Sequence, residues 1–219
     1  MTHTDRLVCS DADREITSDK RGARAKLLDA AVQVIRAQGY AATSVDDLCR
    51  AAGVTKGAFF HHFESKAALA VAAANYWSET TSALFAQAPY HAHADPLDRV
   101  RAYIDFRAQL LEGGVPDFTC LVGTMVQEAY AANDDIRAAC DASISGHAQT
   151  LVADIEAARV KYGVRDKTWG AQSLALHTQA VLQGAFILAK CKGGPEIARE
   201  MAAHLKRYVD LLFKDGRKA

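Results

Sequence analysis

The chain has 219 residues; half of them are apolar, and 26 basic residues balance 26 acidic ones. This length suits one large domain or a small domain followed by a larger one, and no apolar run approaches the roughly 20 residues that a membrane span needs. The five cysteines are odd in number and contain no C-x-x-C pair, which argues against a disulfide framework and structural zinc. Without an apolar leader segment, we expect a cytoplasmic protein with no metal, cofactor or membrane contact.

Positive charge is concentrated near the start of the chain. Residues 17–66 contain eight basic and five acidic side chains, a net charge of +3. The preceding residues 1–16 are polar and acidic and predict a disordered tail. A localised positive charge is what a DNA-binding head requires, although many neutral proteins also carry a basic patch.

The apolar residues recur at helical spacing, and the sequence predicts an all-α fold with nine helices. Thr17 or Ser18 is expected to cap the first helix, Gly39 to end it and Asp166 to cap the eighth. The expected helices run over residues 17–39, 43–52, 55–62, 65–86, 95–111, 117–131, 133–162, 166–190 and 195–213.

The segment 43–69 predicts a helix-turn-helix, because two short helices are joined by a turn that contains Gly53. The first of these helices is too short to be stable alone, so it must share a small core with its neighbours. The residues expected to form that core are Val45, Leu48, Val54, Phe59 and Phe63.

The second short helix presents small, basic and aromatic residues outward, namely Thr55, Lys56, Gly57, Ala58, Phe60, His61 and His62. Small residues allow a helix to enter the major groove, where base edges can be distinguished. Lys56 could reach a guanine edge or a phosphate, and Ala58 a thymine methyl group. Glycine costs a helix about 1 kcal/mol relative to alanine, and a close approach to DNA would explain Gly57.

These residues resemble the DNA-binding signature of the TetR family. The matching groups are Gly39-Tyr40, Thr43-Ser44-Val45, Ala52-Gly53-Val54, Lys56-Gly57, Phe59-Phe60, His62-Phe63 and Ser65-Lys66. The resemblance covers about 50 residues, and the later helices also fit the family in number and length. It implies a DNA-binding domain over residues 17–66 and a ligand-binding and dimerisation domain over residues 67–219.

The resemblance also implies a role for individual residues. Lys56, Gly57 and Ala58 are at positions where the family reads bases. Phosphate contacts are implied for Thr43, Ser44, His61, His62 and Lys66. Members commonly have tyrosine at the position of Phe60, so we expect this ring to pack against sugar instead. Lys20, Arg21 and Arg24 either contact phosphates or form a solvated face.

The family also implies a homodimer on a palindromic operator, whose two half-sites are about 34 Å apart. Its last two helices would pair with those of a second subunit as a four-helix bundle. The residues expected at this contact are Leu174, Val181, Ala185 and Leu188, followed by Ile197, Met201, Leu205, Val209 and Leu212. The alternative is that these residues form only the core of one chain.

The middle helices are expected to enclose a cavity for a small-molecule effector, because apolar pockets with few polar groups are the usual form of such sites. The residues predicted to line it are Tyr103, Phe106, Phe118, Cys120, Met125, Glu128, Trp169 and His177. The alternative for each aromatic residue is a place in the ordinary core.

Cys120 lies near a predicted helix N-terminus, a position that lowers the pKa of a thiol. Residues 120–128 resemble a TetR subgroup that includes sensors of reactive electrophiles or of small unsaturated acids and aldehydes. The alternative is a buried cysteine that acts as a small hydrophobe.

The sequence therefore predicts a repressor that binds operator DNA as a dimer and releases it when an effector binds the helical body. One alternative is a repressor that senses electrophiles or redox state through Cys120. Another is a helical enzyme, although the P-loop, G-x-S-x-G and H-E-x-x-H motifs are absent. A purely protein-binding helical module is a further alternative, and so is a DNA-binding activator or a ligand-free architectural regulator.

Overall fold

The computed structural model describes residues 22–214, and within this range the chain is all-α, as predicted, with no strand. The predicted tail over residues 1–16, the caps at Thr17 and Ser18, Lys20 and Arg21 lie outside the described residues. The helices are α2 (Ala23–Gln38), α3 (Val45–Ala52), α4 (Lys56–His62), α5 (Lys66–Ala86), the 3-10 helix η1 (Pro89–Ala92), α6 (Pro96–Gln109), α7 (Val115–Phe118), α8 (Leu121–Ala129), α9 (Asp134–Lys161), α10 (Ala171–Lys192) and α11 (Glu196–Leu212).

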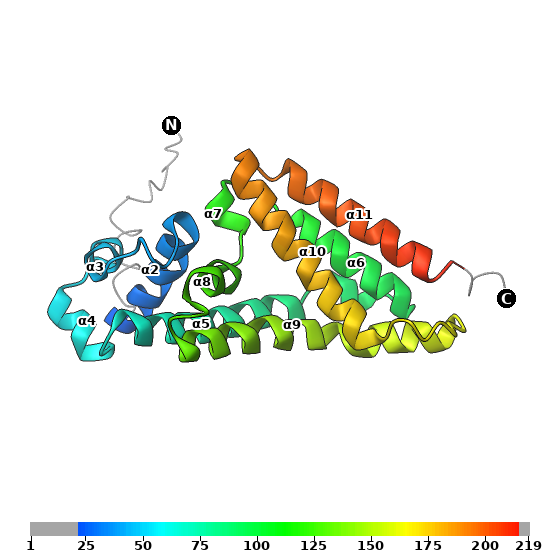
Figure 1. Ribbon diagram of the computed structural model, residues 1–219, viewed down its shortest axis with the longest axis horizontal. Helices are drawn as coiled ribbons and strands as arrows, with labels where there is room; N and C mark the ends of the chain where they lie inside the picture. The colour runs from blue at the N-terminus through cyan, green and yellow to red at the C-terminus, as the bar shows by residue number, and fades with distance from the viewer. Residues whose placement is uncertain (1–21, 215–219) are drawn as a thin grey trace, which may run out of the picture.

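The helices form a small head and a larger body (Figure 1). Helices α2, α3 and α4 cluster at one end of the molecule, and α5 extends from them along one edge beside α9. In the body, α10 packs against α9 and α11, and α6 packs against α9 and α11. The head is thus joined to the body both through α5 and through contacts of α2 with α7 and α8.

Side-chain caps define the short helices of the head. Ser44 caps α3 through a reciprocal capping box with Asp47, Thr55 caps α4, and Ser65 caps α5. Such caps satisfy backbone N–H groups that have no partner within the helix. Gly53 ends α3 with a φ of 64°, in the left-handed region where glycine has no steric penalty. The predicted helix-turn-helix follows from these local signals.

The predicted helix over residues 117–131 is two helices, so the described residues contain ten α-helices instead of nine. Thr119 and Cys120 are extended, with ψ of 159° and 125°, and they separate α7 from α8. The Thr119 carbonyl accepts a hydrogen bond from the Arg36 side chain, and the Cys120 thiol caps α8. The hydrogen bond between Arg36 and Thr119, which are far apart in the sequence, therefore stabilises the break between α7 and α8.

The predicted cap at Asp166 is wrong, because the corresponding helix α10 begins at Ala171 after Gly170. The Asp166 carboxylate instead accepts hydrogen bonds from the backbone and hydroxyl of Thr168. Asp and Ser/Thr side chains readily form such local turns in place of helix caps.

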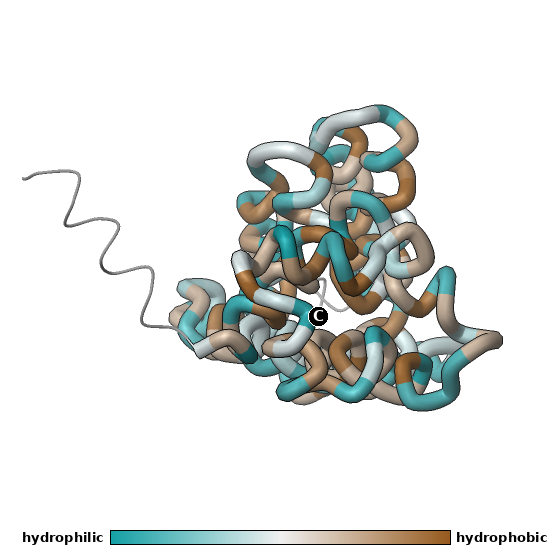
Figure 2. The backbone as a smooth tube through the Cα atoms, turned by 90° about the vertical axis from the view of Figure 1, so that its left-hand side faces the viewer, coloured by the Kyte–Doolittle hydropathy of each residue, from teal (hydrophilic) through white to brown (hydrophobic). Residues whose placement is uncertain are grey.

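The hydrophobic core is continuous across the predicted domain boundary at residue 66. Leu27, Leu48 and Phe59 of the head belong to one buried cluster with Leu121 and Met125 of α8. A second cluster lies between α6, α9, α10 and α11. Apolar and polar residues alternate along the helices (Figure 2), which allows each helix to bury one face and expose another. A change in α8 can therefore reach the head through direct packing.

Candidate functional site

The exposed face of α4 carries the side chains that were predicted to contact DNA. Phe59 is buried and packs against Phe63, which anchors α4 to the rest of the head. On the opposite side, Lys56, Gly57, His61 and His62 are exposed, and Phe60 is 56% exposed. Ala58 is partly exposed. DNA contact by these residues stays a prediction, but their accessibility is compatible with it.

The fold itself does not require glycine at position 57. A Cβ atom there would meet only Thr55 Oγ1, at an ordinary contact distance of 3.7 Å. Gly57 is the second residue of α4, and glycine is the least favourable non-proline residue for helix stability. Packing within the described residues does not explain Gly57, and close approach of DNA at this position stays a prediction.

Lys56 forms an ion pair with Asp46, whose carboxylate Oδ1 is 2.8 Å from Nζ. The hydrogen bond to Asp46 and the attraction between the two charges raise the pKa of Lys56. Both side chains are largely exposed, so the pair contributes little to stability. Lys56 can exchange Asp46 for a phosphate or a base edge at small cost.

The predicted phosphate contact of Thr43 is wrong, and Lys66 has a structural role within the head. Thr43 is 1% exposed, and its hydroxyl donates to the Gly39 carbonyl, so it is not available to DNA. Lys66 is half-buried, and its ammonium group donates to the carbonyls of Tyr40 and Thr43. Both residues hold the loop after α2 in place, because buried polar groups are satisfied within the fold.

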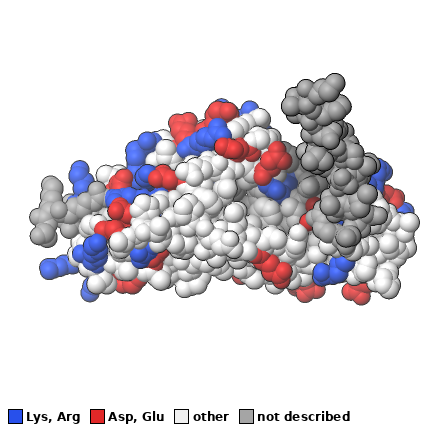
Figure 3. Space-filling model, turned by 180° about the vertical axis from the view of Figure 1, so that it is seen from behind, with Lys and Arg blue, Asp and Glu red and all other residues white. Residues whose placement is uncertain are grey.

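The remaining predicted DNA contacts are exposed but have local roles. The Ser44 hydroxyl donates to Asp47 and accepts from its backbone, and the Thr55 hydroxyl accepts from the Ala58 amide. Arg24 is exposed, with its guanidinium carbon 5.6 Å from the centre of the Phe63 ring. Lys20 lies outside the described residues. Positive and negative side chains are interspersed on the face shown in Figure 3, so the basic residues do not merge into one large patch there.

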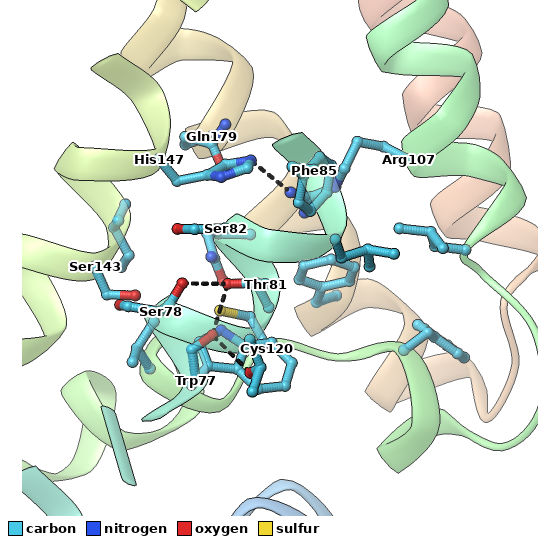
Figure 4. Close-up of a pocket in the computed structure, with 18 of the residues that line it drawn as sticks. Trp77, Ser78, Thr81, Ser82, Phe85, Arg107, Cys120, Ser143, His147 and Gln179 are labelled. Atoms are coloured by element: carbon cyan, nitrogen blue, oxygen red, sulfur yellow. Dashed lines mark hydrogen bonds between the residues drawn. The ribbon is translucent and has the colours of Figure 1, made fainter. Parts of the chain in front are cut away.

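A cavity of about 430 Å³ lies in the body and reaches the head at Arg36. Its wall is formed by α2, α5, α6, α7, α9 and α10 and by the segment between α7 and α8. Figure 4 shows side chains from several of these helices pointing into the cavity. About half of the lining residues are apolar, and the others are polar or charged, including four hydroxyl residues of α5. Small-molecule sites commonly combine apolar walls with polar groups that orient the ligand. Its principal members are Arg36, Trp77, Phe85, Arg107, Phe118, Cys120, His147, Gln179 and Phe186.

Arg36 connects the head to this cavity. It belongs to α2, and its Nε donates to the Thr119 carbonyl at 2.6 Å. Its guanidinium carbon lies 4.9 Å from the centre of the Trp77 ring. Burial lowers the pKa of Arg36, and nearby Cys120 and Asp117 oppose that shift. A ligand beside Trp77 or Cys120 would therefore contact a helix of the DNA-binding head.

The other end of the cavity contains a network of polar side chains. Tyr103 Oη lies 2.9 Å from His147 Nε2 and accepts a hydrogen bond from Gln179. Arg107 lies 3.3 Å from the same nitrogen of His147, as the dashed line in Figure 4 marks. Burial, assisted by the charge of Arg107, lowers the pKa of His147 to about 3. His147 is therefore neutral at physiological pH.

Of the predicted ligand-binding residues, Phe118 and Cys120 line the cavity. Cys120 is half-buried and accepts a hydrogen bond from the Gly123 amide as the cap of α8. Tyr103 is fully buried behind the lining, although its hydroxyl bonds to residues of the wall. Phe106 is partly buried against the body core and does not line the cavity.

Three other residues predicted to bind the ligand lie away from the cavity, so these predictions are wrong. Met125 is fully buried in the core that joins head and body. Trp169 packs against Phe213 in the other cluster. His177 is exposed on α10 and packs against Tyr208. These residues were predicted from their chemistry and helical spacing. Neither property determines which face of a helix is turned toward the cavity.

Glu128 also lies outside the main cavity and contacts the head instead. Its carboxylate Oε2 accepts a hydrogen bond from the Ala41 amide at 2.6 Å. A Cβ atom at Gly39, where φ is 89°, would clash with Oε1 of Glu128. Glu128 therefore fits against the loop that follows α2. It also lines a smaller pocket of about 250 Å³ between α8 and α10, together with Lys190.

Most of the residues that line the cavity were not predicted from the sequence. Arg36 was assigned to the head alone, and Trp77, Phe85, Arg107, His147 and Gln179 were not among the predicted site residues. Polar residues inside long helices were the available signal, since Arg107 and His147 interrupt faces that are otherwise buried. Their convergence depends on how five separate helices pack.

The apolar residues predicted for the dimer contact differ in their burial. Four are buried within the chain, so they belong to the intrachain core: Leu174, Ala185, Leu205 and Val209. Four others are partly buried: Val181, Ile197, Met201 and Leu212. Leu188 is 40% exposed. The other large apolar side chains exposed on α10 and α11 are Leu176, Ile187, Tyr208 and Leu211.

Residues 27–73 match the model of bacterial regulatory proteins of the tetR family, and residues 96–204 match that of the C-terminal domain of LmrA/YxaF-like transcriptional regulators. The chain belongs to the TetR family. This confirms the resemblance found in residues 39–66. Within residues 22–214, no helix is long and apolar enough to cross a membrane.

Several characterised relatives share this assignment. The transcriptional regulator AcuR of Cereibacter sphaeroides is 32% identical over 121 residues, which are 53% of each chain. The repressor KstR2 of Rhodococcus jostii is 46% identical over 50 residues, 23% of this chain and 24% of KstR2. The alignments thus span about half, or less, of these TetR-family proteins.

Solved structures are similar over most of the chain. A TetR regulatory protein from Rhodobacter sphaeroides superposes with a TM-score of 0.72 at 25% identity and covers 86% of this chain and 99% of that one. A TetR regulator from Chloroflexus aurantiacus gives 0.71 at 26% identity, with coverage of 90% and 96%. The reduced form of E. coli NemR gives 0.72 at 23% identity, with coverage of 85% and 96%.

Proposed function

We propose that this TetR-family chain is a ligand-responsive repressor and not an enzyme. It binds a palindromic double-stranded operator as a homodimer in the cytoplasm and releases the DNA when a small molecule occupies the body. In this proposal, residues up to 66 form the DNA-binding unit and residues from 67 form the ligand-binding and dimerisation unit. The observation that carries the proposal is the position of α2, which supports the exposed helix α4 and also forms part of the cavity wall.

The proposed mechanism is a shift between two arrangements of the head. Arg36 links α2 to the segment between α7 and α8, and Glu128 links α8 to the loop after α2. A ligand in the cavity that prefers a displaced α8 moves the head through these two links. The shift is limited by the difference in affinity between the two arrangements, typically about 1–3 kcal/mol.

The test of DNA binding uses an operator selected from a random duplex library by the purified protein. Replacing Lys56 with alanine should weaken binding to that duplex by about tenfold to a hundredfold, because a base or phosphate contact is lost. Lys167→Ala, at an exposed lysine in the loop before α10, is the matched control and should bind like the parent. Electrophoretic mobility shift gives the affinities.

A second test removes the Asp46 carboxylate, which competes with DNA for Lys56. Asp46→Asn should strengthen binding, because it frees Lys56 and removes a negative charge that faces the DNA. Selection of no duplex, or equal affinity of Lys56→Ala and the parent, would contradict the proposed recognition helix.

A second candidate function is favoured by Cys120, which lies in the cavity wall at the cap of α8. Here the inducer is an α,β-unsaturated carbonyl compound. The sulfur adds to its β-carbon, the double bond becomes single, and the thiol proton ends on the α-carbon. N-ethylmaleimide should then release the operator from the parent but not from Cys120→Ser.

Cys191 is exposed, and Cys191→Ser is therefore the matched control, which should still respond to N-ethylmaleimide. Mass spectrometry of the modified protein locates the adduct. Release that persists in Cys120→Ser would remove this candidate and leave reversible ligand binding in place.

A further inference from the structure

Arg107 has no acidic partner in the described part of the chain. It is half-buried in the cavity wall, and no carboxylate of residues 22–214 forms an ion pair with it. The neighbouring arginines on α6 differ in this respect, because Arg99 pairs with Asp154, and Arg101 pairs with Asp98 and Asp210. A half-buried charge without a counter-ion is costly, and an anion that enters the cavity would reduce that cost.

Aromatic rings hold the Arg107 guanidinium in place. Its central carbon lies 5.3 Å from the centre of the Phe85 ring, 5.9 Å from that of Phe186 and 6.0 Å from that of Tyr103. One terminal nitrogen lies 3.3 Å from His147 Nε2 and 3.4 Å from Tyr103 Oη. Donors on the rest of the guanidinium have no partner among residues 22–214. The Arg107 guanidinium is therefore held in one orientation, but its positive charge is not neutralised. This arrangement favours a two-point contact with a carboxylate.

The charges around the cavity favour an anion over a cation. The charged lining residues are Arg36, Arg107 and Asp117, and His147 is neutral at physiological pH. Asp117 accepts a hydrogen bond from the Gly114 amide and offsets part of the charge of Arg36. Arg36 is in addition engaged by Thr119 and Trp77. Arg107, in contrast, has no nearby carboxylate among the described residues to offset its charge.

The remaining lining favours an organic acid over an inorganic anion. Trp77, Phe85, Ile144 and Phe186 give the cavity apolar surface beside the hydroxyl groups of α5, and its volume of about 430 Å³ accommodates a tail of several carbon atoms. The geometry points to a monocarboxylic acid with an apolar or aromatic tail as the effector, bound by its carboxylate to Arg107. This inference rests on the proposed effector site but not on DNA binding.

The experiment measures ligand binding without DNA, so it remains informative if operator binding fails. The probes are hexanoate and 3-phenylpropanoate, each compared with its primary amide, which has the same shape without the charge. Isothermal titration calorimetry with the full-length chain gives the affinities. Trp77 lines the cavity and Trp169 packs in the other core cluster, so a change in tryptophan fluorescence of a Trp169→Phe variant reports occupancy of this site.

We expect at least one acid to bind at least about tenfold more tightly than its amide, because hydrogen bonds between charged groups are stronger than those between neutral groups. Arg107→Gln should abolish this preference, and Arg107→Lys should keep part of it because the charge remains. Arg36→Gln should retain the preference. Circular dichroism and thermal unfolding of each variant establish that it folds.

Three outcomes would overturn the inference. They are equal affinity of each acid and its amide for the parent, an acid preference that survives in a folded Arg107→Gln variant, and loss of the preference in Arg36→Gln alone. Should Arg107→Gln not fold, the comparison of Arg107→Lys with the parent decides, because a carboxylate bound through the two-point contact must weaken in that variant.

Discussion

Individual polar residues in this protein have roles that depend on what surrounds them. Lys66 and Thr43 match a DNA-binding signature, but both are satisfied by backbone carbonyls of the head. Lys56 and Gly57, a few positions away, have no such role and are exposed. Accessibility therefore separates residues that can contact DNA from residues that hold the head together around α4.

The half-buried His147 predicts a loss of stability in acid. Burial lowers its pKa from 6.5 to about 3 in the folded chain, so only the unfolded chain accepts its proton between these values. The free energy of unfolding should therefore fall as pH decreases below 6.5, with a slope approaching about 1.4 kcal/mol per pH unit. Urea denaturation at pH 7 and pH 5 measures this change.

His147→Gln is the variant for comparison, because glutamine cannot take up the proton. The variant should lose about 2 kcal/mol less than the parent between pH 7 and pH 5. All other titrating groups are common to the two chains, so their effects cancel in the comparison. An identical pH dependence of parent and variant would show that His147 is not the group responsible.

At the scale of secondary-structure elements, α8 is the link between cavity and head. Its N-terminal cap, Cys120, lines the cavity, and Glu128 near its C-terminal end contacts the loop after α2. Leu121 and Met125, between them, are buried in the core that includes head residues. A rigid helix with these contacts at its two ends can transmit a displacement over its length.

Replacing Glu128 with alanine should loosen this connection without unfolding the body. The Ala41 amide loses its partner, so hydrogen exchange at Ala41 should accelerate. Because Ala41 is exposed and water can replace the carboxylate, the cost to stability should be about 1 kcal/mol or less. Operator affinity should also fall, because the head is less well fixed. Gln127→Ala is the matched control, since the Gln127 side chain donates only within its own helix, to the Gly123 carbonyl. Unchanged exchange at Ala41 in Glu128→Ala would rule out this link.

At the scale of the whole molecule, α10 and α11 expose a face that a single chain does not cover. Leu176, Ile187, Leu188, Tyr208 and Leu211 are each at least 40% exposed. Scattered exposed apolar residues are ordinary, but a group on two adjacent helices marks an interaction site. We assign this face to the proposed homodimer, because the two chains would then bury it by symmetry.

Leu211→Glu should shift the protein from dimer to monomer. Leu211 is 64% exposed, and a symmetric contact would place the new charge in the interface twice. We expect the dissociation constant of the dimer to rise by about tenfold or more, as measured by analytical ultracentrifugation. Val160→Glu, at a 75% exposed site on α9, is the control and should leave the dimer intact. A monomeric parent, or a dimeric Leu211→Glu variant, would refute the assignment.

The sequence alone determined the all-α class, the helix-turn-helix and the family, because these depend on local signals. Helical spacing, the caps at Ser44 and Thr55 and the left-handed turn at Gly53 act over a few residues and can be recognised in order. The exposed residues of α4 were predicted for the same reason. Only the tertiary structure decided the wall of the cavity, the split between α7 and α8 and the position of Glu128. Arg36 and Thr119 are 83 residues apart, and Ala41 and Glu128 are 87 apart, so no local pattern could pair them.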